Sequence, residues 1–344
     1  MIAPSKLFPD KIDRLDIVRN AAAQAARLNA QGLKPCLVID SWFFPKLGVI
    51  VNVPDLAVVE AERALEVIDG LDPVRSVVLY AIEHAQDGLP IVRRMVERKV
   101  RFLPLGGAQV GGWVYDDPVA RRVIEEAYLS QTFAGFAKFE DPGSKDDFVN
   151  LTQALAATDR IDGCVVEVGC YRGSSGAVML DYANAKGLRP RAFHFFDVFE
   201  GFNYKEALES SDANWANTHV SDGEPMVRER LTSRAGAHAV TVSRMNIISD
   251  SLPPDLGPIA VANLDVDLYE AVKAGLERLA PLIAIGGIMI CEDAGHTPAL
   301  IGARLALEEF MSADAGQAFT PVHLTSGQVF LVKHAAPSGG AQEG

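Results

Sequence analysis

Short apolar runs alternate with segments of helical spacing along most of the chain, and this pattern is typical of a sheet with helices on both faces. In the first part of the chain, the apolar runs predict strands at 35–39, 47–53, 76–82 and 100–105. Helical spacing at 59–68 and 90–96 predicts helices between them. The glycine pairs of 106–112 predict a plain loop rather than a ligand site, because such pairs usually mark turns. These residues therefore form a small α/β layer of their own.

The second part of the chain repeats the alternation on a larger scale. Its predicted helices are 146–157, 174–185, 226–233, 268–279 and 297–311, and its predicted strands are 164–168, 192–196, 239–243, 259–264, 286–291, 319–324 and 328–333. The last two strands, joined through Thr325, Ser326 and Gly327, predict a closing antiparallel hairpin. We expect an α/β, doubly wound, mostly parallel sheet preceded by the smaller α/β layer. The predicted domains are 1–135 and 136–335, followed by a disordered tail at 336–344.

A glycine-rich turn follows the most strongly apolar strand. The stretch CVVEVGCYRGSSG begins at Cys164, and its spacing Gly169-x-x-x-Gly173 is not the G-x-G-x-x-G of dinucleotide-binding proteins. It also lacks the Lys-Ser/Thr that ends a phosphate-binding loop, so NAD and ATP are both disfavoured. Ser174 is the expected N-cap of the next helix. A purely structural turn in another doubly wound protein is the alternative.

Asp197 ends the next predicted strand, where this fold places a carboxylate that accepts hydrogen bonds from ribose hydroxyls. An ordinary surface aspartate in a turn is the alternative interpretation. The segment that follows, 198–225, is long, polar and without periodicity, yet it contains four aromatic residues. Long connections of this kind are usually functional or disordered, and the aromatic residues favour an ordered lid over the ligand site.

Four acidic residues follow two further strands. Asp265 and Asp267 come at the end of 259–264, and Glu292 and Asp293 follow 286–291. Because adjacent parallel strands end at one edge of a sheet, we expect these carboxylates to share a cleft, where they would repel one another unless a cation is bound. Oxygen ligands without a His or Cys pair favour Mg²⁺, Mn²⁺ or Ca²⁺ over zinc. Solvated acidic loop ends are the alternative.

Composition narrows the classes of function. The 344 residues have a formal net charge of −13, which argues against a nucleic-acid partner and leaves small-molecule substrates as the better fit. The start of the chain has no signal-peptide pattern, and the longest apolar stretch, 279–291, is too short to span a bilayer, so we expect a soluble, cytoplasmic protein. The four cysteines show no C-x-x-C pairing, so we expect buried, reduced thiols rather than a zinc site.

Residues 164–333 resemble the macrocin O-methyltransferase family of class I S-adenosylmethionine-dependent methyltransferases, which act on sugar hydroxyls of natural products. Four motifs carry the resemblance: E-x-G-x-x-x-G at 167–173, D-x-F-E-G at 197–201, L-D-x-D-L-Y-E at 264–270, and the doublet Glu292-Asp293. The family more often has Asp-Asp at the doublet and Asp-Ser-Phe at 197–199. The first 135 residues do not resemble the short members of the family, and we expect them to serve oligomerisation or to cover the site.

The resemblance implies two ligands and a set of residues for each. The expected cofactor, S-adenosylmethionine, would contact Glu167, Gly169, Tyr171, Gly173, Ser174, Asp197, Phe199 and Asp265. A divalent cation, expected to be Mg²⁺, would be bound by Asp265, Glu292 and Asp293. Asp267 matches the family's proposed general base, and His296 in DAGH is a second candidate for that role. A catechol-type methyltransferase and a non-catalytic, methyltransferase-like binding or assembly protein are the alternatives.

Overall fold

The computed structural model describes residues 14–40, 55–82, 85–105, 117–129, 144–210 and 215–335. Backbone contacts divide the chain into two compact units, Met1–Pro118 and Val119–Gly344. Four predictions lie outside the described residues: the strand at 47–53, the loop at 106–112, the domain junction at 135 and the disordered tail at 336–344. None of the helices in the described ranges is long and apolar enough to cross a membrane.

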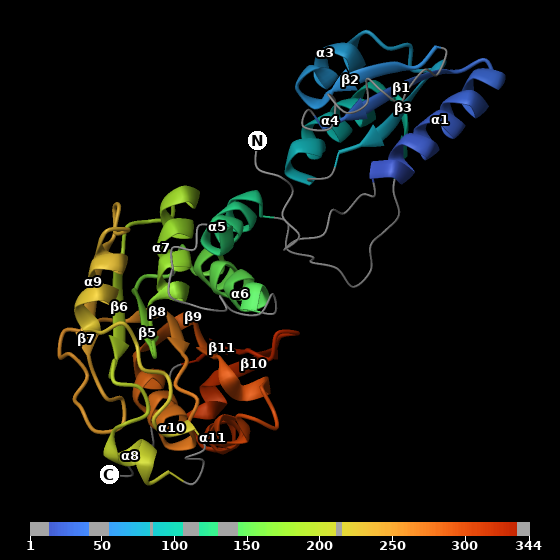
Figure 1. Cartoon of the computed structure of the whole chain (residues 1–344). Helices are drawn as coiled ribbons and strands as arrows, with labels where there is room; N and C mark the ends of the chain where they lie inside the picture. Colours follow the sequence, from blue (N-terminus) through green and yellow to red (C-terminus); the bar gives the residue numbers. More distant parts are fainter. Residues whose placement is uncertain are drawn as a thin grey trace, which may run out of the picture. The chain divides into compact units, whose positions relative to one another are not determined.

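The first unit contains a four-stranded parallel sheet of its own (Figure 1). Its strand order is β2-β1-β3-β4, with β1 at Lys34–Ile39, β2 at Ala57–Glu60, β3 at Ser76–Ala81 and β4 at Arg101–Pro104. Its helices are α1 (Arg14–Ala30), η1 (Ala61–Arg63), α3 (Ala64–Asp69) and α4 (Ala85–Arg98). The predicted helix at 59–68 begins later than expected, because the segment before it pairs with β1 as the edge strand β2.

The second unit contains a seven-stranded sheet of order β10-β11-β9-β8-β5-β6-β7. Its strands are β5 (Cys164–Val168), β6 (Ala192–Asp197), β7 (Ala239–Arg244), β8 (Ile259–Leu264), β9 (Ile283–Cys291), β10 (Phe319–His323) and β11 (Val329–Lys333). The pairings from β7 to β9 are parallel, whereas β11 runs antiparallel to both β9 and β10. The predicted doubly wound, mostly parallel sheet with a closing antiparallel hairpin is therefore confirmed.

Helices cover both faces of this sheet (Figure 1). One layer contains α6 (Ser144–Ala157), α7 (Ser174–Lys186) and α9 (Glu224–Thr232), and the other contains α10 (Tyr269–Leu279) packed on α11 (Ile301–Ser312). Further elements are α5 (Pro118–Leu129), α8 (Lys205–Leu208), η3 (Ala280–Leu282), η4 (Asp293–Gly295) and η5 (Gly316–Ala318). The central strands β5 and β8 are buried along their whole length.

In the second unit, two boundaries differ from the sequence prediction by three residues or more. Strand β9 starts at Ile283, three residues early, and α11 starts at Ile301, four residues late. The late start has a local cause, since Asp293–Gly295 forms a 3₁₀ turn and the residue before Pro298 is biased away from helical backbone. All four cysteines are free and buried, as predicted.

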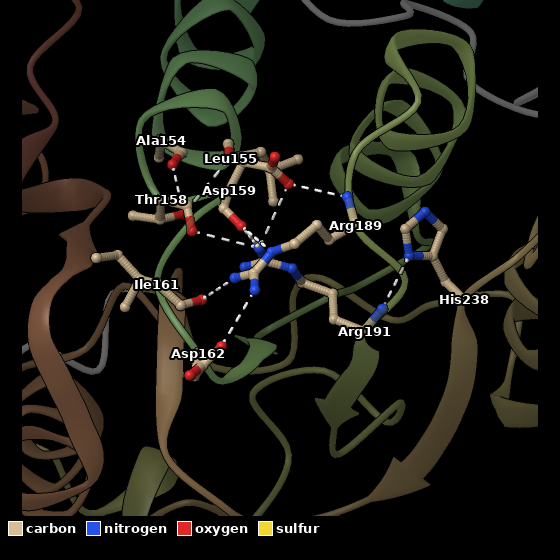
Figure 2. Close-up of polar contacts among 9 residues, drawn as sticks. All are labelled: Ala154, Leu155, Thr158, Asp159, Ile161, Asp162, Arg189, Arg191 and His238. Carbon is tan, nitrogen blue, oxygen red and sulfur yellow. Dashed lines mark hydrogen bonds and ion pairs between the residues drawn. The ribbon is translucent and has the colours of Figure 1, made fainter.

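Two arginines hydrogen-bond to the backbone of the turn that follows the C-terminal end of α6 (Figure 2). Arg191, whose side chain is 7% exposed, donates from Nη2 to the carbonyls of Thr158 (3.3 Å) and Asp159 (2.9 Å). Arg189 donates from Nη2 to the carbonyl of Ile161 at 3.0 Å. Cations are favourable at a helix C-terminus, where the last carbonyls lack intrahelical partners. These bonds fix α6 against the start of β6, and α6 contributes Asp147, Phe148 and Leu151 to the site described next.

Candidate active site

A cavity of about 410 Å³ lies at the carboxyl edge of the seven-stranded sheet. Its wall is formed by the residues that follow β5, β6, β8 and β9, together with residues of α6 and of the turn before β11. This edge is where open α/β sheets bind ligands. Of the residues predicted for the site, those that line the cavity are Gly169, Tyr171, Ser174, Asp197, Asp265, Asp267, Glu292, Asp293 and His296.

The glycine turn after β5 is shaped by the fold itself. Gly169 has a φ of +92°, and a Cβ built there would lie 1.6 Å from the carbonyl oxygen of Asp265. The resemblance implies that Gly169 contacts the cofactor, and the structure adds that the neighbouring strand end leaves no space for a side chain at this position. Gly173, with a φ of +83°, is the N-cap of α7. The N-cap prediction for Ser174 was wrong by one residue, because only glycine adopts this left-handed backbone without strain.

Asp197 joins the glycine turn to the end of β6. Its Oδ2 accepts the backbone N–H of Tyr171 at 2.7 Å, and its Oδ1 accepts that of Phe199 at 2.6 Å. Burial raises the pKa of Asp197, and these two N–H groups oppose that shift by favouring the charged form. Each carboxylate oxygen has two lone pairs, so both retain capacity for ligand hydroxyls. Phe199 itself is 2% exposed and takes part through its backbone.

Glu167 and Asn263 form a buried polar pair on the neighbouring strands β5 and β8. Asn263 donates from Nδ2 to Glu167 Oε1 at 2.9 Å. Glu167 Oε2 and Asn263 Oδ1 are both buried, and neither has a hydrogen-bond partner among the described residues. Burial raises the pKa of Glu167 to about 7. Two buried oxygens without a partner fit a ligand group that donates hydrogen bonds, such as an ammonium group.

The predicted acidic residues gather in two groups rather than one. Asp265, Asp267 and Asp293 each offer a carboxylate oxygen within 4.8 Å of the others, and we call this set the acidic triad. Asp293 is 2% exposed, and its Oδ2 accepts the backbone N–H of Asp267 at 2.9 Å. Asp267 has a φ of +58°, a left-handed conformation that is rare outside glycine and often marks functional sites.

Glu292 belongs to a second group with Asp147 and His296, whose ligand atoms also lie within 4.8 Å of one another. Burial, followed by repulsion from Asp265 and Asp293, holds the pKa of Glu292 well above its usual range. His296 places Nδ1 3.7 Å from Glu292 Oε2, and its Nε2 lies 3.2 Å from the carbonyl oxygen of Ser326. A carbonyl can only accept, so Nε2 carries the proton and Nδ1 faces the carboxylates.

Aromatic rings from the segment after β6 form another part of the wall. Phe202 and His219 line the cavity, with ring centroids 5.1 Å apart, and the Trp215 ring lies 5.7 Å from that of His219. Tyr171 contacts the same His219 ring at 5.8 Å. Burial lowers the pKa of His219, which favours its neutral form. From the predicted lid, the residues that line the cavity are Val198, Gly201, Phe202, Tyr204 and His219.

Four residues of the site were missed by the sequence analysis: Asp147, His219, Asn263 and Gln328. Only Asn263 left a signal, since a polar side chain inside the buried strand IAVANL requires a partner. Asp147 reads as an ordinary acidic residue in the first turn of a helix, and the other two stand in polar turns. Their positions depend on the packing of distant segments.

The fold and the cavity together define a class I methyltransferase architecture: a seven-stranded sheet with a reversed strand near one edge, and a glycine turn that opens a ligand cavity at its carboxyl edge. The model of the macrocin O-methyltransferase (TylF) family matches residues 145–319, about half of the chain. The chain belongs to this family. The region of the match contains all four motifs of the sequence analysis.

Two curated relatives from Streptomyces show sequence similarity. The 8-demethyl-8-(2,3-dimethoxy-alpha-L-rhamnosyl)-tetracenomycin-C 4'-O-methyltransferase of Streptomyces olivaceus is 29% identical over 141 residues, which is 39% of this chain and 54% of that protein. The demethyldecarbamoylnovobiocin O-methyltransferase of Streptomyces niveus is 24% identical over 56% of this chain and 79% of its own length. Among solved structures, the O-methyltransferase NovP is 20% identical, with a TM-score of 0.49 over 56% of this chain and 81% of NovP.

Proposed function

We propose that this protein is an S-adenosylmethionine-dependent O-methyltransferase that acts, with a divalent cation, on a hydroxyl group of a sugar or glycosylated natural product. The observation that carries the proposal is a single cavity that connects the glycine turn and Asp197 to the acidic triad. A methyl donor and an activated hydroxyl must lie next to each other for the reaction. This cavity offers a region for the donor, beside the glycine turn and Asp197, and a region for the hydroxyl, beside the acidic triad. The name of the Streptomyces olivaceus relative, which includes a rhamnosyl group, is consistent with a glycosylated acceptor.

The cofactor end fits S-adenosylmethionine. Glu167 Oε2 and Asn263 Oδ1 are buried acceptors without a partner within the described ranges, and the ammonium group of the methionine part would satisfy them. Asp197 can accept bonds from ribose hydroxyls with the lone pairs that Tyr171 and Phe199 leave open. No phosphate-binding cation is needed, because this ligand carries no phosphate.

The acidic triad fits a divalent cation. Three carboxylates with oxygens within 4.8 Å of one another repel unless a positive charge lies between them. The expected ligands Asp265, Glu292 and Asp293 offer only oxygen donors, which suits Mg²⁺ or another hard cation. A bound ion would lower the pKa of an acceptor hydroxyl, which makes the hydroxyl a better nucleophile.

The residues of the chain then position the reactants and remove one proton. The acceptor oxygen forms a bond to the methyl carbon while the sulfonium carbon–sulfur bond breaks, and the hydroxyl proton passes to a base of the protein. We assign this role to Asp267, whose carboxylate belongs to the triad. His296 is the second candidate, although both of its ring nitrogens already face groups of the protein.

One experiment tests the proposal against its alternatives. The purified protein is titrated with S-adenosylmethionine by calorimetry and then assayed for methyl transfer to methyl glycosides and to catechol, with Mg²⁺ or with EDTA. We expect micromolar binding, transfer to a glycoside and loss of transfer in EDTA. Transfer to catechol alone would favour the phenolic alternative. Binding without any transfer would favour a binding or assembly protein, and no binding at millimolar ligand would exclude the methyltransferase function.

The first unit is proposed to mediate homo-oligomerisation. Its helix α4 exposes Leu89 and Val96, which are seven residues apart and thus lie on one face of the helix. Exposed apolar side chains on one face favour contact with another protein surface. Light scattering of the full chain and of Leu89→Lys tests this point, and equal masses that match a monomer would exclude it.

A further inference from the structure

A buried side-chain amide lies at one end of the cavity, where α6 and the turn before β11 form the wall. Gln328 is 1% exposed and lines the cavity. Its Oε1 accepts a bond from Asn150 Nδ2 at 2.8 Å, whereas its Nε2 is buried and has no hydrogen-bond partner in the described part of the chain. A buried donor without a hydrogen-bond partner destabilises the folded state, so a partner from outside the chain is expected.

The direction of this amide is fixed by its neighbours. Gln153 donates from Nε2 to Asn150 Oδ1 at 3.3 Å, and Asn150 then donates from Nδ2 to Gln328 Oε1 and, at 3.0 Å, to Ser326 Oγ. Because Asn150 presents its NH₂ group, Gln328 must present its oxygen to Asn150 and turn its own NH₂ group elsewhere. Asn150 is 7% exposed and stands behind Gln328, outside the cavity lining.

The sheet order places Gln328 on the opposite side of the acidic residues from the cofactor end. The glycine turn follows β5, the acidic triad follows β8 and β9, and Gln328 precedes β11, which is the neighbour of β9. The cavity thus runs from the cofactor end, past the carboxylates, to Gln328. A molecule that accepts the methyl group beside the triad would extend toward this amide.

The groups near Gln328 complement a polyol. Asp147 and Glu292 line the cavity together with Gln328, and their carboxyl oxygens lie close to each other. A sugar hydroxyl both donates and accepts hydrogen bonds, so neighbouring hydroxyls of one ring can accept from Gln328 Nε2 and donate to a carboxyl oxygen. A catechol has no further oxygen beyond its two hydroxyls and would leave the Gln328 donor unpaired. A site with a buried donor discriminates strongly against a substrate that lacks the matching acceptor.

We propose that Gln328, oriented by Asn150, is a specificity-determining residue that selects a sugar acceptor. Its Nε2 donates a hydrogen bond to a ring or hydroxyl oxygen of the sugar other than the methylated hydroxyl and its immediate neighbour, the two oxygens that a catechol also offers. This inference rests on the proposed function, because it assumes that the acceptor occupies the same cavity as the methyl donor. Gln328 contacts the acceptor and Asn150 acts through Gln328, so Asn150 is a positioning residue.

The test uses saturation-transfer NMR on the full chain with saturating S-adenosylhomocysteine and Mg²⁺. The probes are a set of methyl hexopyranosides, which includes methyl α-L-rhamnopyranoside, and catechol. We expect the wild-type protein to transfer saturation to at least one glycoside. Gln328→Met should lower the affinity for that glycoside about tenfold, the effect of one lost hydrogen bond. Asn150 keeps Ser326 Oγ as a partner in this variant. Gln317→Met, at an exposed position, is the matched control and should bind the glycoside as wild type does.

A second variant keeps Gln328 and changes only its direction. Asn150→Asp replaces the donor that faces Gln328 Oε1 with an acceptor, so the Gln328 amide should rotate and present oxygen to the cavity. We expect the same loss of glycoside binding, with S-adenosylhomocysteine affinity unchanged by calorimetry. The inference is overturned if no glycoside binds to wild type, or if a glycoside binds equally to Gln328→Met. Failure of the proposed function would differ, since S-adenosylhomocysteine would then not bind at all.

Discussion

The backbone N–H of Asp267 donates to Oδ2 of Asp293 at 2.9 Å and thereby joins the end of β8 to the end of β9. This bond holds two members of the acidic triad together and leaves Oδ1 of Asp293 for other contacts. Asp293→Asn keeps an oxygen for that N–H but removes the charge. We expect the fold to survive, Mg²⁺ binding to be lost and kcat/KM to fall by about 100-fold.

Calorimetric titration with Mg²⁺ measures the first effect without any substrate. Asp314→Asn, at an exposed position, is the matched control. Unchanged Mg²⁺ affinity in Asp293→Asn would show that the triad is a polar wall rather than a metal site. Full activity of the wild-type protein in EDTA would lead to the same conclusion.

Turnover measurements on two variants distinguish whether Asp267 or His296 is the base. If Asp267 is the base, Asp267→Asn should lower kcat by about 100-fold or more while Mg²⁺ affinity stays near that of wild type, because a base is needed only for proton removal. His296→Asn should then change kcat little. Loss of Mg²⁺ binding in Asp267→Asn would make Asp267 a ligand instead, and a larger loss of kcat in His296→Asn would transfer the role of base to the histidine.

Gly169 is expected to be a structural requirement. A Cβ in Gly169→Ala would overlap the Asp265 carbonyl, and its backbone conformation disfavours any other residue, so we expect a loss of about 3 kcal/mol or more in the free energy of unfolding. Gly187→Ala is the matched control. Its φ is +70°, but its Cβ would meet no atom within 4 Å among the described residues, and we expect a loss of about 1 kcal/mol. Equal urea midpoints for the two variants would contradict this explanation.

Asp197→Ala should weaken the binding of S-adenosylmethionine by about 1–3 kcal/mol, the usual contribution of hydrogen bonds to a charged group. The variant should also lower the free energy of unfolding, because two backbone N–H groups at Tyr171 and Phe199 lose their acceptor. Calorimetry and urea unfolding measure the two effects separately. An unchanged dissociation constant would show that Asp197 does not contact the ribose. Asp255→Ala, at an exposed position, is the control for loss of charge.

Glu167 predicts a pH dependence of cofactor binding. Burial raises its pKa to about 7, opposed by the Ser175 hydroxyl and the Asn263 amide and supported by repulsion from Asp197. The free protein therefore holds this proton up to neutral pH, and a bound ammonium group favours its release. Affinity for S-adenosylmethionine should rise from about pH 6 to about pH 8, with proton release visible in buffers of different ionisation enthalpy.

The same shift has the opposite sign for stability without ligand. The folded state binds more protons than the unfolded state between the ordinary pKa of Glu167 and its raised value, so the free energy of unfolding should fall as pH rises through that range. Glu167→Gln should remove both effects, and Glu209→Gln, at an exposed position, should remove neither. Identical pH profiles for Glu167→Gln and wild type would refute the assignment.

The sequence by itself determined the strands and the chemistry at their ends. Apolar runs bounded by glycine or acidic residues place β5, β6 and β8 within one residue of their observed positions. Asp197, Asp265 and Asp293 were found because residues that end parallel strands meet at one edge of the sheet, whatever the details of packing. Periodicity also predicted the closing hairpin, since its alternation and turn are local features.

Only the tertiary structure decided which polar groups share the cavity and why Gly169 must be small. Asn150 and Gln328 are 178 residues apart along the chain and meet because α6 packs against the segment that leads into β11. Asp147 joins Glu292 and His296 by the same packing. The clash at Gly169 depends on the distance between two strand ends, which no local pattern encodes. Hydrogen bonds and steric limits between distant segments arise only when the sheet is assembled, and for that reason the acceptor end of the site is absent from the sequence pattern.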